Sequence, residues 1–195
     1  MPEKGSARKA LGLDPKSKVV LFLGRLAPVK GLDMLLRAFA RLILAEARLV
    51  VAGPDEGDGY MAGLLQLVEK LGLRERVQFP GPIYGKQKIG LLGDADVVVL
   101  PSVFESFGNV AAEAVAAGTP VVVTKDCGIA PFIQDRGGLV TDHKASLVAD
   151  AMNQLLVERE LHQTFTKRCA DVAREFSWDE PVMQMESLYH ALDNG

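Results

Sequence analysis

Two glutamates, Glu105 and Glu113, lie eight positions apart in the stretch PSVFESFGNVAAEAVAAGTPVVV, residues 101–123. The first follows an apolar run typical of a buried strand, and the second lies in an alanine-rich segment that predicts a helix. A carboxylate has two acceptor oxygens, which suit the paired hydroxyls of a sugar cis-diol. Gly108 leads into the predicted helix, and free backbone N–H groups at a helix N-terminus form a natural phosphate site.

Structural explanations stay open for both glutamates. In the structural explanation, Glu105 interacts favourably with the positive N-terminal end of the helix dipole, and Glu113 lies on an exposed edge of its helix. The second explanation fits the sequence less well, because the residues from 111 to 117 are small and apolar on nearly every side of Glu113. An acid in such a setting usually has a dedicated partner.

Two cations follow the first predicted strand, in the loop GRLAPVKG of residues 24–31. The loop matches neither a Walker loop nor the GxGxxG pattern of dinucleotide-binding folds. Arg25 can bind phosphate oxygens through two parallel hydrogen bonds, and Lys30 adds a mobile point charge. Taken alone, the usual behaviour of charged loop residues favours two solvated cations.

Two further loops carry weaker signals. The loop GPDEGDGY, residues 53–60, holds three acids, but their spacing does not match an EF-hand metal site and no glutamate closes the loop. A flexible turn into the next helix is the favoured interpretation. In the loop PGPIYG, residues 80–85, Ile83 could pack on a planar base or form a hydrophobic plug, and alone the pattern favours the plug.

The elements that carry these loops alternate between strands and helices. The predicted strands are apolar throughout, which indicates parallel pairing with both faces covered. Right-handed crossovers then give an α/β, doubly wound, Rossmann-like sheet of six strands with helices on both faces, and ligands bind beyond its carboxyl edge. The predicted strands are residues 18–24, 47–53, 76–79, 96–100, 120–124 and 138–141. The predicted helices are residues 32–46, 61–73 with Gly72 as C-cap, 86–95 and 110–118, followed by a helical turn at 129–138. From residue 144 onward the pattern is helical, with a break at 176–181. Leu147, Ala151 and Leu155 form an apolar stripe in this region.

Composition limits the function classes. A chain of 195 residues that is 48% hydrophobic suits one domain, or two small ones, with a real core. Its net charge of −3 does not indicate non-specific nucleic-acid binding, which needs a basic face. Cys127 and Cys169 lack the spacing of a disulfide framework or a zinc site, and the histidines lack metal-ligand spacing. With no signal-peptide core at the start and no apolar run long enough for a bilayer, we expect a soluble, cytoplasmic protein.

Together, these motifs resemble the C-terminal domain of a retaining, GT-B-fold glycosyltransferase of family 4, the glycosyl transferases group 1. GRLAPVKGLD resembles the family's GR...KG segment, and the stretch that begins at Pro101 resembles its PSxxExFGxxxxEAxAxGxPV pattern with the E-x7-E pair. GPDEG, LGLRERVQFPGPIYG and the late FSW also fit. The resemblance covers about residues 18–189. We therefore expect residues 1–195 to form a single nucleotide-sugar-binding domain, with 1–17 as a lead-in and 177–195 as a C-terminal helix.

The resemblance implies a role for each candidate residue. The two loop cations would hold the donor's diphosphate, Glu105 would lie near the transferred sugar, and Glu113 would bind the ribose hydroxyls. Ile83 would pack near the base, and backbone amides at 107–109 would touch the phosphates. No catalytic metal or cofactor is implied, because the cations do that electrostatic work on the leaving group. The implied catalytic residues are Glu105, Arg25 and Lys30, and the implied donor-binding residues are Arg25, Lys30, Ile83, Phe107, Gly108, Asn109 and Glu113.

Two departures from the family pattern stand out. The family often has a GGxxE-like segment after the strand that follows the E-x7-E helix, with its acid near the donor. Here the segment is DCGIAPFIQD, residues 126–135, where Pro131 and Phe132 stand at the place of the acid. The second departure is the missing N-terminal GT-B domain, which normally brings the acceptor site.

The sequence thus predicts the donor-binding domain of an enzyme that transfers a sugar from a UDP-, GDP- or ADP-sugar with retention. Alone, the domain is expected to bind the nucleotide and turn over poorly, because half of the positioning groups are absent. The alternative is a stand-alone binding module that pairs with a separate N-terminal-type subunit. A sugar-nucleotide epimerase is disfavoured by the E-x7-E pair. Peripheral membrane association of the full enzyme stays open.

Overall fold

A parallel sheet forms the centre of the molecule. The computed structural model describes residues 2–193, and its six strands pair in the order β3-β2-β1-β4-β5-β6. The chain moves outward from β1 in one direction and from β4 in the other, so the sheet is doubly wound, as predicted. The strands are β1 Val19–Leu23, β2 Arg48–Ala52, β3 Val77–Gly81, β4 Val97–Leu100, β5 Val121–Thr124 and β6 Gly138–Thr141.

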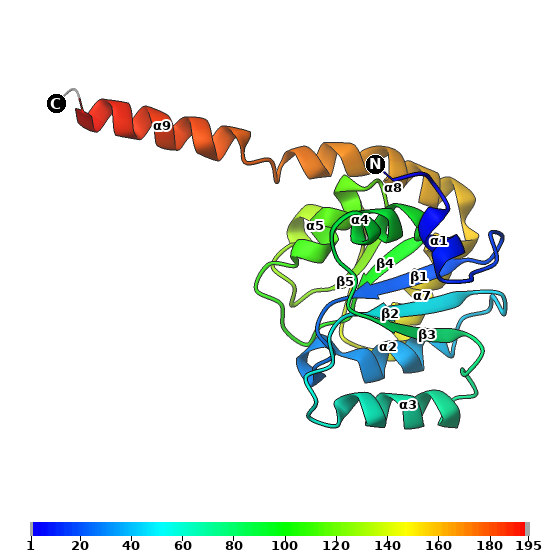
Figure 1. Cartoon of the computed structure of the whole chain (residues 1–195). Coiled ribbons are helices and arrows are strands. Elements are labelled where there is room, and N and C mark those ends of the chain that lie inside the picture. The colour runs from blue at the N-terminus through cyan, green and yellow to red at the C-terminus, as the bar shows by residue number, and fades with distance from the viewer. Residues whose placement is uncertain (1, 194–195) are drawn as a thin grey trace.

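Helices cover both faces of this sheet (Figure 1). α2, α3 and α7 lie on one face, and α1, α4 and α5 lie on the other, where α8 packs against α5. The predicted fold class is therefore confirmed. The helices are α1 Ser6–Ala10, η1 Pro28–Lys30, α2 Leu32–Phe39, α3 Tyr60–Lys70, α4 Gly85–Asp94, α5 Asn109–Ala116, α6 Ala130–Ile133, α7 Ala145–Val157, α8 Arg159–Arg174 and α9 Asp179–Asp193.

The sheet divides the apolar core into two layers. In β1, Val20 and Phe22 face the layer of α2, α3 and α7, whereas Val19 and Leu21 face the layer of α4 and α5. Every residue of this strand is buried. A strand that is covered on both faces needs an apolar side chain at each position, which explains the unbroken apolar runs in the sequence.

Two predictions on the first helices can be compared with the structure. The helix predicted at 32–46 ends at Phe39, because the amides of Arg41 and Leu42 bond to carbonyls three residues back and the chain turns toward β2. Ile43 is consequently 72% exposed rather than part of the apolar face. The C-cap of α3 is Leu71, and Gly72 follows it with the left-handed backbone that closes the helix, while the Leu73 amide donates a hydrogen bond to the Val68 carbonyl.

The helical region after residue 144 differs from the prediction in its buried face. Leu147, placed in the predicted stripe, is 38% exposed, whereas Ala151 and Leu155 are buried as predicted. The neighbouring positions Val148 and Met152 complete the buried face, because α7 packs on both the sheet and α2. The apolar contact surface is therefore wider than one narrow stripe.

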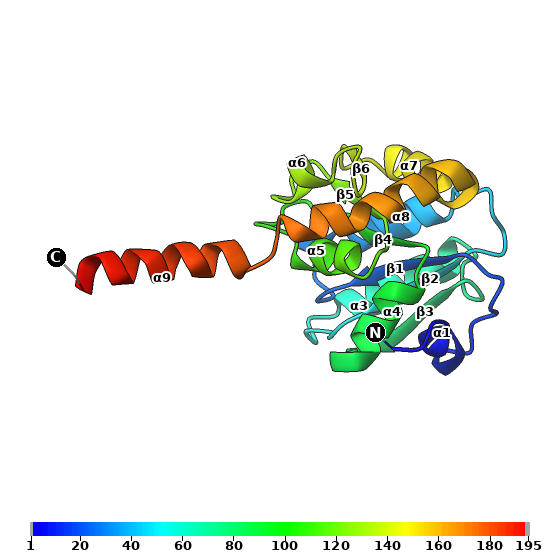
Figure 2. The ribbon, with the colours of Figure 1, turned by 90° about the horizontal axis from the view of Figure 1, so that it is seen from above.

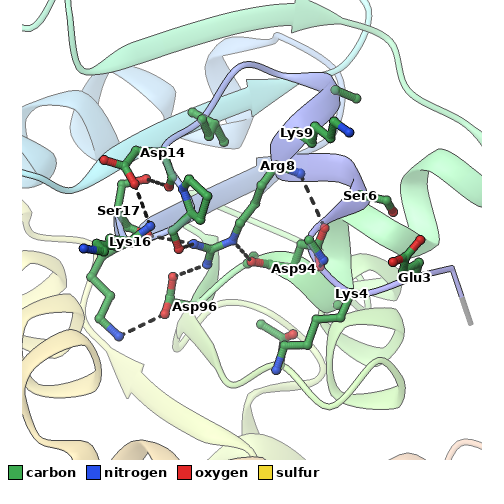
Figure 3. Close-up of a pocket in the computed structure, with 18 of the residues that line it drawn as sticks. Glu3, Lys4, Ser6, Arg8, Lys9, Asp14, Lys16, Ser17, Asp94 and Asp96 are labelled. Atoms are coloured by element: carbon green, nitrogen blue, oxygen red, sulfur yellow. Dashed lines mark hydrogen bonds and ion pairs between the residues drawn. The ribbon is translucent and has the colours of Figure 1, made fainter.

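The N-terminal lead-in is fixed to the amino edge of the sheet (Figure 3). Arg8 of α1 forms an ion pair with Asp96 at 2.6 Å, and Lys18 contacts the other oxygen of Asp96 at 3.0 Å. Asp94 accepts hydrogen bonds from the amides of Gly5 and two residues of α1. Residues of the lead-in line a hollow of about 1480 Å³.

The last helix has a different relation to the body. α9 extends away from the sheet and its covering helices, beyond the end of α8 (Figures 1 and 2). Its large apolar side chains are exposed: Val182, Met183, Met185, Leu188, Tyr189 and Leu192. A C-terminal helix was predicted at 177–195, and the final two positions lie outside the described residues.

Candidate donor-binding site

The candidate site lies at the carboxyl edge, where the strand order reverses between β1 and β4. The four loops singled out in the sequence follow the adjacent strands β3, β2, β1 and β4, so the fold brings them to one edge. A cavity of about 200 Å³ opens between the loops after β1 and β4. Five predicted site residues line it: Arg25, Lys30, Glu105, Gly108 and Asn109. In doubly wound sheets, this crevice is the usual ligand position.

Backbone hydrogen bonds tie these loops to one another. The Leu26 amide bonds to the Pro54 carbonyl at 2.9 Å, and the Val103 amide bonds to the Val29 carbonyl at 2.9 Å. Gly31 has a left-handed backbone with φ of 68°, and a Cβ at this position would stand 2.1 Å from the Pro101 carbonyl oxygen. Glycine is therefore required there, because any side chain would push the loop after β1 away from the end of β4.

Lys30 and Glu105 form an ion pair across the mouth of the sheet. Lys30 comes from the loop after β1, and Glu105 comes from the loop after β4. Their side chains are only 20% and 18% exposed. This contradicts the interpretation of Lys30 as a solvated loop cation, and it gives the cavity one charge of each sign.

The loop that carries Glu105 is paired with the segment after β5. The Glu105 amide donates to the Asp126 carbonyl at 3.1 Å, and the Gly128 amide donates to the Glu105 carbonyl at 2.9 Å. A Cβ at Gly128 would stand 2.2 Å from the Ser106 carbonyl oxygen, so this close approach needs glycine. Cys127 lies between these bonds, and burial raises the pKa of its thiol. The segment without the family's usual acid therefore holds the Glu105 loop in place.

Arg25 is more exposed than Lys30 and has a different acidic partner. Its guanidinium contacts Glu56 in the loop after β2, and the two side chains are 58% and 38% exposed. The other acids of that loop make local contacts, since Asp55 accepts from the Gly57 amide and Asp58 accepts from the Tyr60 amide. These contacts agree with the predicted turn into a helix. Among residues 2–193, no group of three or more His, Cys, Asp or Glu side chains is arranged to hold a metal ion.

The N-terminus of α5 reaches the same cavity. Gly108 is buried and precedes the helix, and Asn109 is its first residue. Within the described chain, no side chain caps this helix, and the amides at 107–109 donate no hydrogen bond. These N–H groups are available to an anion at the positive end of the helix dipole. The Phe107 side chain instead packs edge-to-face on Phe176 at a centroid distance of 5.5 Å.

Glu113 corrects the expectation drawn from its apolar neighbours. Its side chain is 43% exposed, because α5 packs on the sheet and α8 through other faces, with Ala111, Ala114 and Val115 buried. It does have a dedicated partner. Lys88 of α4 contacts both carboxylate oxygens, at 2.7 and 2.6 Å. Glu113 is not among the residues that line the cavity, but Asn109, which does line it, precedes Glu113 by four residues and shares its helix face.

Ile83 lies apart from these groups. It is half-buried against the core layer of α4 and α5, and it lines a separate hollow with α1. The residues that line the cavity between β1 and β4 do not include it. This position favours the hydrophobic plug over a direct contact to a base.

Phe132 stands where the family pattern has an acid, and it joins an aromatic cluster. Its ring lies edge-on to Phe176 at 5.3 Å, and Phe176 in turn contacts Phe107. The cluster links α6 to the end of α8 and to the loop that precedes α5. The aromatic ring thus has a packing role that an acid could not fill.

Sequence reasoning missed one polar group next to the site. The Nε2 atom of His143 is buried and has no hydrogen-bond partner in the described chain. It lies 3.0 Å from the point where a Cβ on Gly31 would stand. The sequence offered no signal for this placement, because His143 follows β6, two strands away from β4.

Comparison with known proteins identifies the family. Residues 3–171 match the model of the family described as glycosyl transferases group 1. The chain belongs to this family. Its fold matches the C-terminal domain of a glycosyl transferase group 1 family protein, LpcC, from Francisella tularensis, with a TM-score of 0.78 and 22% identity over 90% of this chain and 93% of that one.

Two longer relatives add to this finding. The chain is 38% identical to the D-inositol 3-phosphate glycosyltransferase of Mycolicibacterium gilvum, over 98% of its own length and 45% of that protein. It matches Anabaena HepE in complex with UDP-glucose with a TM-score of 0.84 and 25% identity, over 94% of this chain and 52% of HepE. The chain thus spans about half the length of each of these two proteins. Among residues 2–193, no helix is both long and apolar enough to cross a membrane.

Proposed function

We propose that this chain is the donor-binding half of a retaining glycosyltransferase that uses a UDP-sugar. The observation that carries the proposal is the cavity at the strand-order reversal, which is lined by Arg25, Lys30, Glu105 and the start of α5. Cations and free helix N–H groups suit a diphosphate, and the adjacent carboxylates suit sugar hydroxyls. The choice of UDP rests on HepE, whose structure contains UDP-glucose.

The proposed roles follow from position. Lys30 and Arg25 hold the diphosphate and neutralise the charge that develops when the bond between the anomeric carbon and the phosphate oxygen breaks. Amides at 107–109 bind the same phosphates, and Glu113 accepts hydrogen bonds from the ribose hydroxyls. Glu105 faces the transferred hexosyl group from its fixed position beside Lys30. No metal is assigned to this reaction.

The acceptor site belongs to the half of the enzyme that the chain does not span. Two observations support such a partner domain: the chain covers only 45% of the inositol-phosphate glycosyltransferase, and the apolar side chains of α9 are exposed. A separate subunit would cover the same helix, so the stand-alone module is the second candidate. In either case we expect this chain alone to bind the nucleotide with negligible transfer.

Calorimetric titration tests the proposal directly. The chain is titrated with UDP, GDP and ADP, first without metal and then with magnesium. We expect saturable binding of UDP without metal, and a large loss of affinity in Arg25→Ala and Glu113→Ala. Unchanged affinity in both variants would contradict the site assignment, and preference for another nucleotide would contradict the choice of UDP.

A further inference from the structure

Lys88 is an unassigned cation beside the proposed ribose ligand. It lies in the first turn of α4, and its ammonium contacts the two carboxylate oxygens of Glu113 at 2.7 and 2.6 Å. We infer that Lys88 is a positioning residue that holds the Glu113 carboxylate in the orientation that receives the two ribose hydroxyls. The inference rests on the proposed function and adds a residue to its nucleotide specificity.

The geometry leaves Glu113 free to bind a second partner. A carboxylate has about four lone-pair positions, and Lys88 occupies one on each oxygen. Each oxygen therefore keeps an acceptor position for one hydroxyl of a cis-diol. Asn109 lies one turn earlier on the same face of α5, and it lines the cavity. The ribose hydroxyls should therefore approach Glu113 from the side that is nearest to the cavity.

The exposure of the pair points to positioning rather than to folding. The Lys88 and Glu113 side chains are 28% and 43% exposed, and ion pairs with this much solvent access contribute little to folding stability. The contact between α4 and α5 also has an apolar part, in which Leu91 and Leu92 of α4 belong to the same buried cluster as Ala111 of α5. Removal of the ammonium therefore leaves the helices packed and frees only the glutamate side chain.

The experiment compares two nucleotides on two proteins. UDP and 2′,3′-dideoxy-UDP are titrated into the parent chain and into Lys88→Met. We expect Lys88→Met to bind UDP about three- to tenfold more weakly, because the free carboxylate must be ordered on binding. The dideoxy nucleotide has no ribose hydroxyls, so its affinity should be the same for both proteins. Equal UDP affinity, or tighter UDP binding by Lys88→Met, would overturn the inference.

Matched variants separate positioning from charge and from structure. Lys86→Met removes the same charge from the exposed side of α4 and should leave UDP affinity unchanged. Lys88→Arg should restore most of the affinity, because a guanidinium can also contact both oxygens. In Glu113→Gln, the further change Lys88→Met should have no effect on UDP binding. If UDP binds the parent and depends on Glu113 but not on Lys88, only this inference fails. If UDP does not bind the parent, the proposed function fails first.

Discussion

Lys30 and Glu105 meet as a partly buried ion pair, although 75 positions of sequence separate them. The pair joins the loops after β1 and β4 at the point where the strand order reverses. Its cation suits a phosphate and its anion suits a sugar hydroxyl, so the two parts of a nucleotide sugar would meet there. We therefore expect UDP affinity to change differently when Lys30 is replaced and when Glu105 is replaced.

Replacement of Lys30 should weaken diphosphate binding selectively. Lys30→Met removes the cation and leaves the Glu105 carboxylate unpaired beside the phosphate position. We expect UDP affinity to fall about 10- to 100-fold, the range of a lost charge-assisted hydrogen bond. Uridine, which has no phosphate, should bind the parent and the variant equally in the same calorimetric titration. An equal loss for both ligands would indicate a damaged fold rather than a lost phosphate contact.

Replacement of Glu105 should act in the opposite direction on UDP. Glu105→Gln removes a negative charge near the diphosphate and frees Lys30, so UDP should bind as tightly as in the parent or about two- to tenfold more tightly. The control Asp126→Asn removes the same charge from an exposed neighbouring position and should change the affinity little. Weaker UDP binding by Glu105→Gln would place this carboxylate outside the proposed sugar role.

The sequence predicted the fold well because its signals are local and repeated. Strands buried on both faces must be apolar throughout, and helices must alternate with them, so the sheet and the loops at its carboxyl edge could be inferred. The end of α2 at Phe39 could not be inferred, because the apolar residues Leu42 and Ile43 continue the helical spacing while the chain turns toward β2.

The side-chain contacts within the site could not be predicted from the sequence, for a different reason. Glu56 contacts Arg25 from 31 positions away, and Lys88 contacts Glu113 from 25 positions away, each on a separate element. Nothing local specifies such pairs. Similarly, the apolar residues around Glu113 in the sequence do not show which side of α5 faces solvent, because α8 and the sheet together determine that side.

Gly128 should be essential for the shape of the Glu105 loop. In Gly128→Ala, the new Cβ would stand 2.2 Å from the Ser106 carbonyl oxygen, so the paired backbone segments must separate. We expect a loss of about 1–3 kcal/mol in unfolding free energy and a lower Tm by calorimetry, with UDP binding impaired. Gly63→Ala is the control, since a Cβ there would meet no atom within 4 Å beyond the backbone of its own helix, and α3 should be slightly stabilised. A Gly128→Ala variant with parental Tm and affinity would refute the close-approach argument.

Asp96 should make the stability of the lead-in depend on pH. Burial alone would raise the pKa of this carboxyl, but the Val19 amide, Lys18 and Arg8 outweigh it and lower the pKa below its usual range. The ionised form thus stabilises the folded state above about pH 4, and this contribution is lost as the pH falls through the lowered pKa.

The matching variant is Asp96→Asn, measured by urea unfolding across this pH range. At neutral pH it should lose about 1.5–3 kcal/mol, because Arg8 and Lys18 lose a charged acceptor. Its stability should then fall less steeply than that of the parent as the pH drops below about 4. Asp150→Asn, at an exposed position of α7, should keep the parental profile. Identical acid profiles for the parent and Asp96→Asn would show that Asp96 does not carry this dependence.

The exposed helix α9 should control self-association rather than folding. Its large apolar side chains are exposed, Leu188 for example by 55%, so isolated chains at high concentration should associate through them. Leu188→Glu should shift the sedimentation profile toward the monomer, whereas Ser187→Glu adds the same charge at a polar position and should shift it less. Both variants should keep the parental Tm, because α9 extends away from the body (Figure 2). A lower Tm in Leu188→Glu alone would mean that this side chain supports the fold, and the proposed contact with a second domain would lose its main structural support.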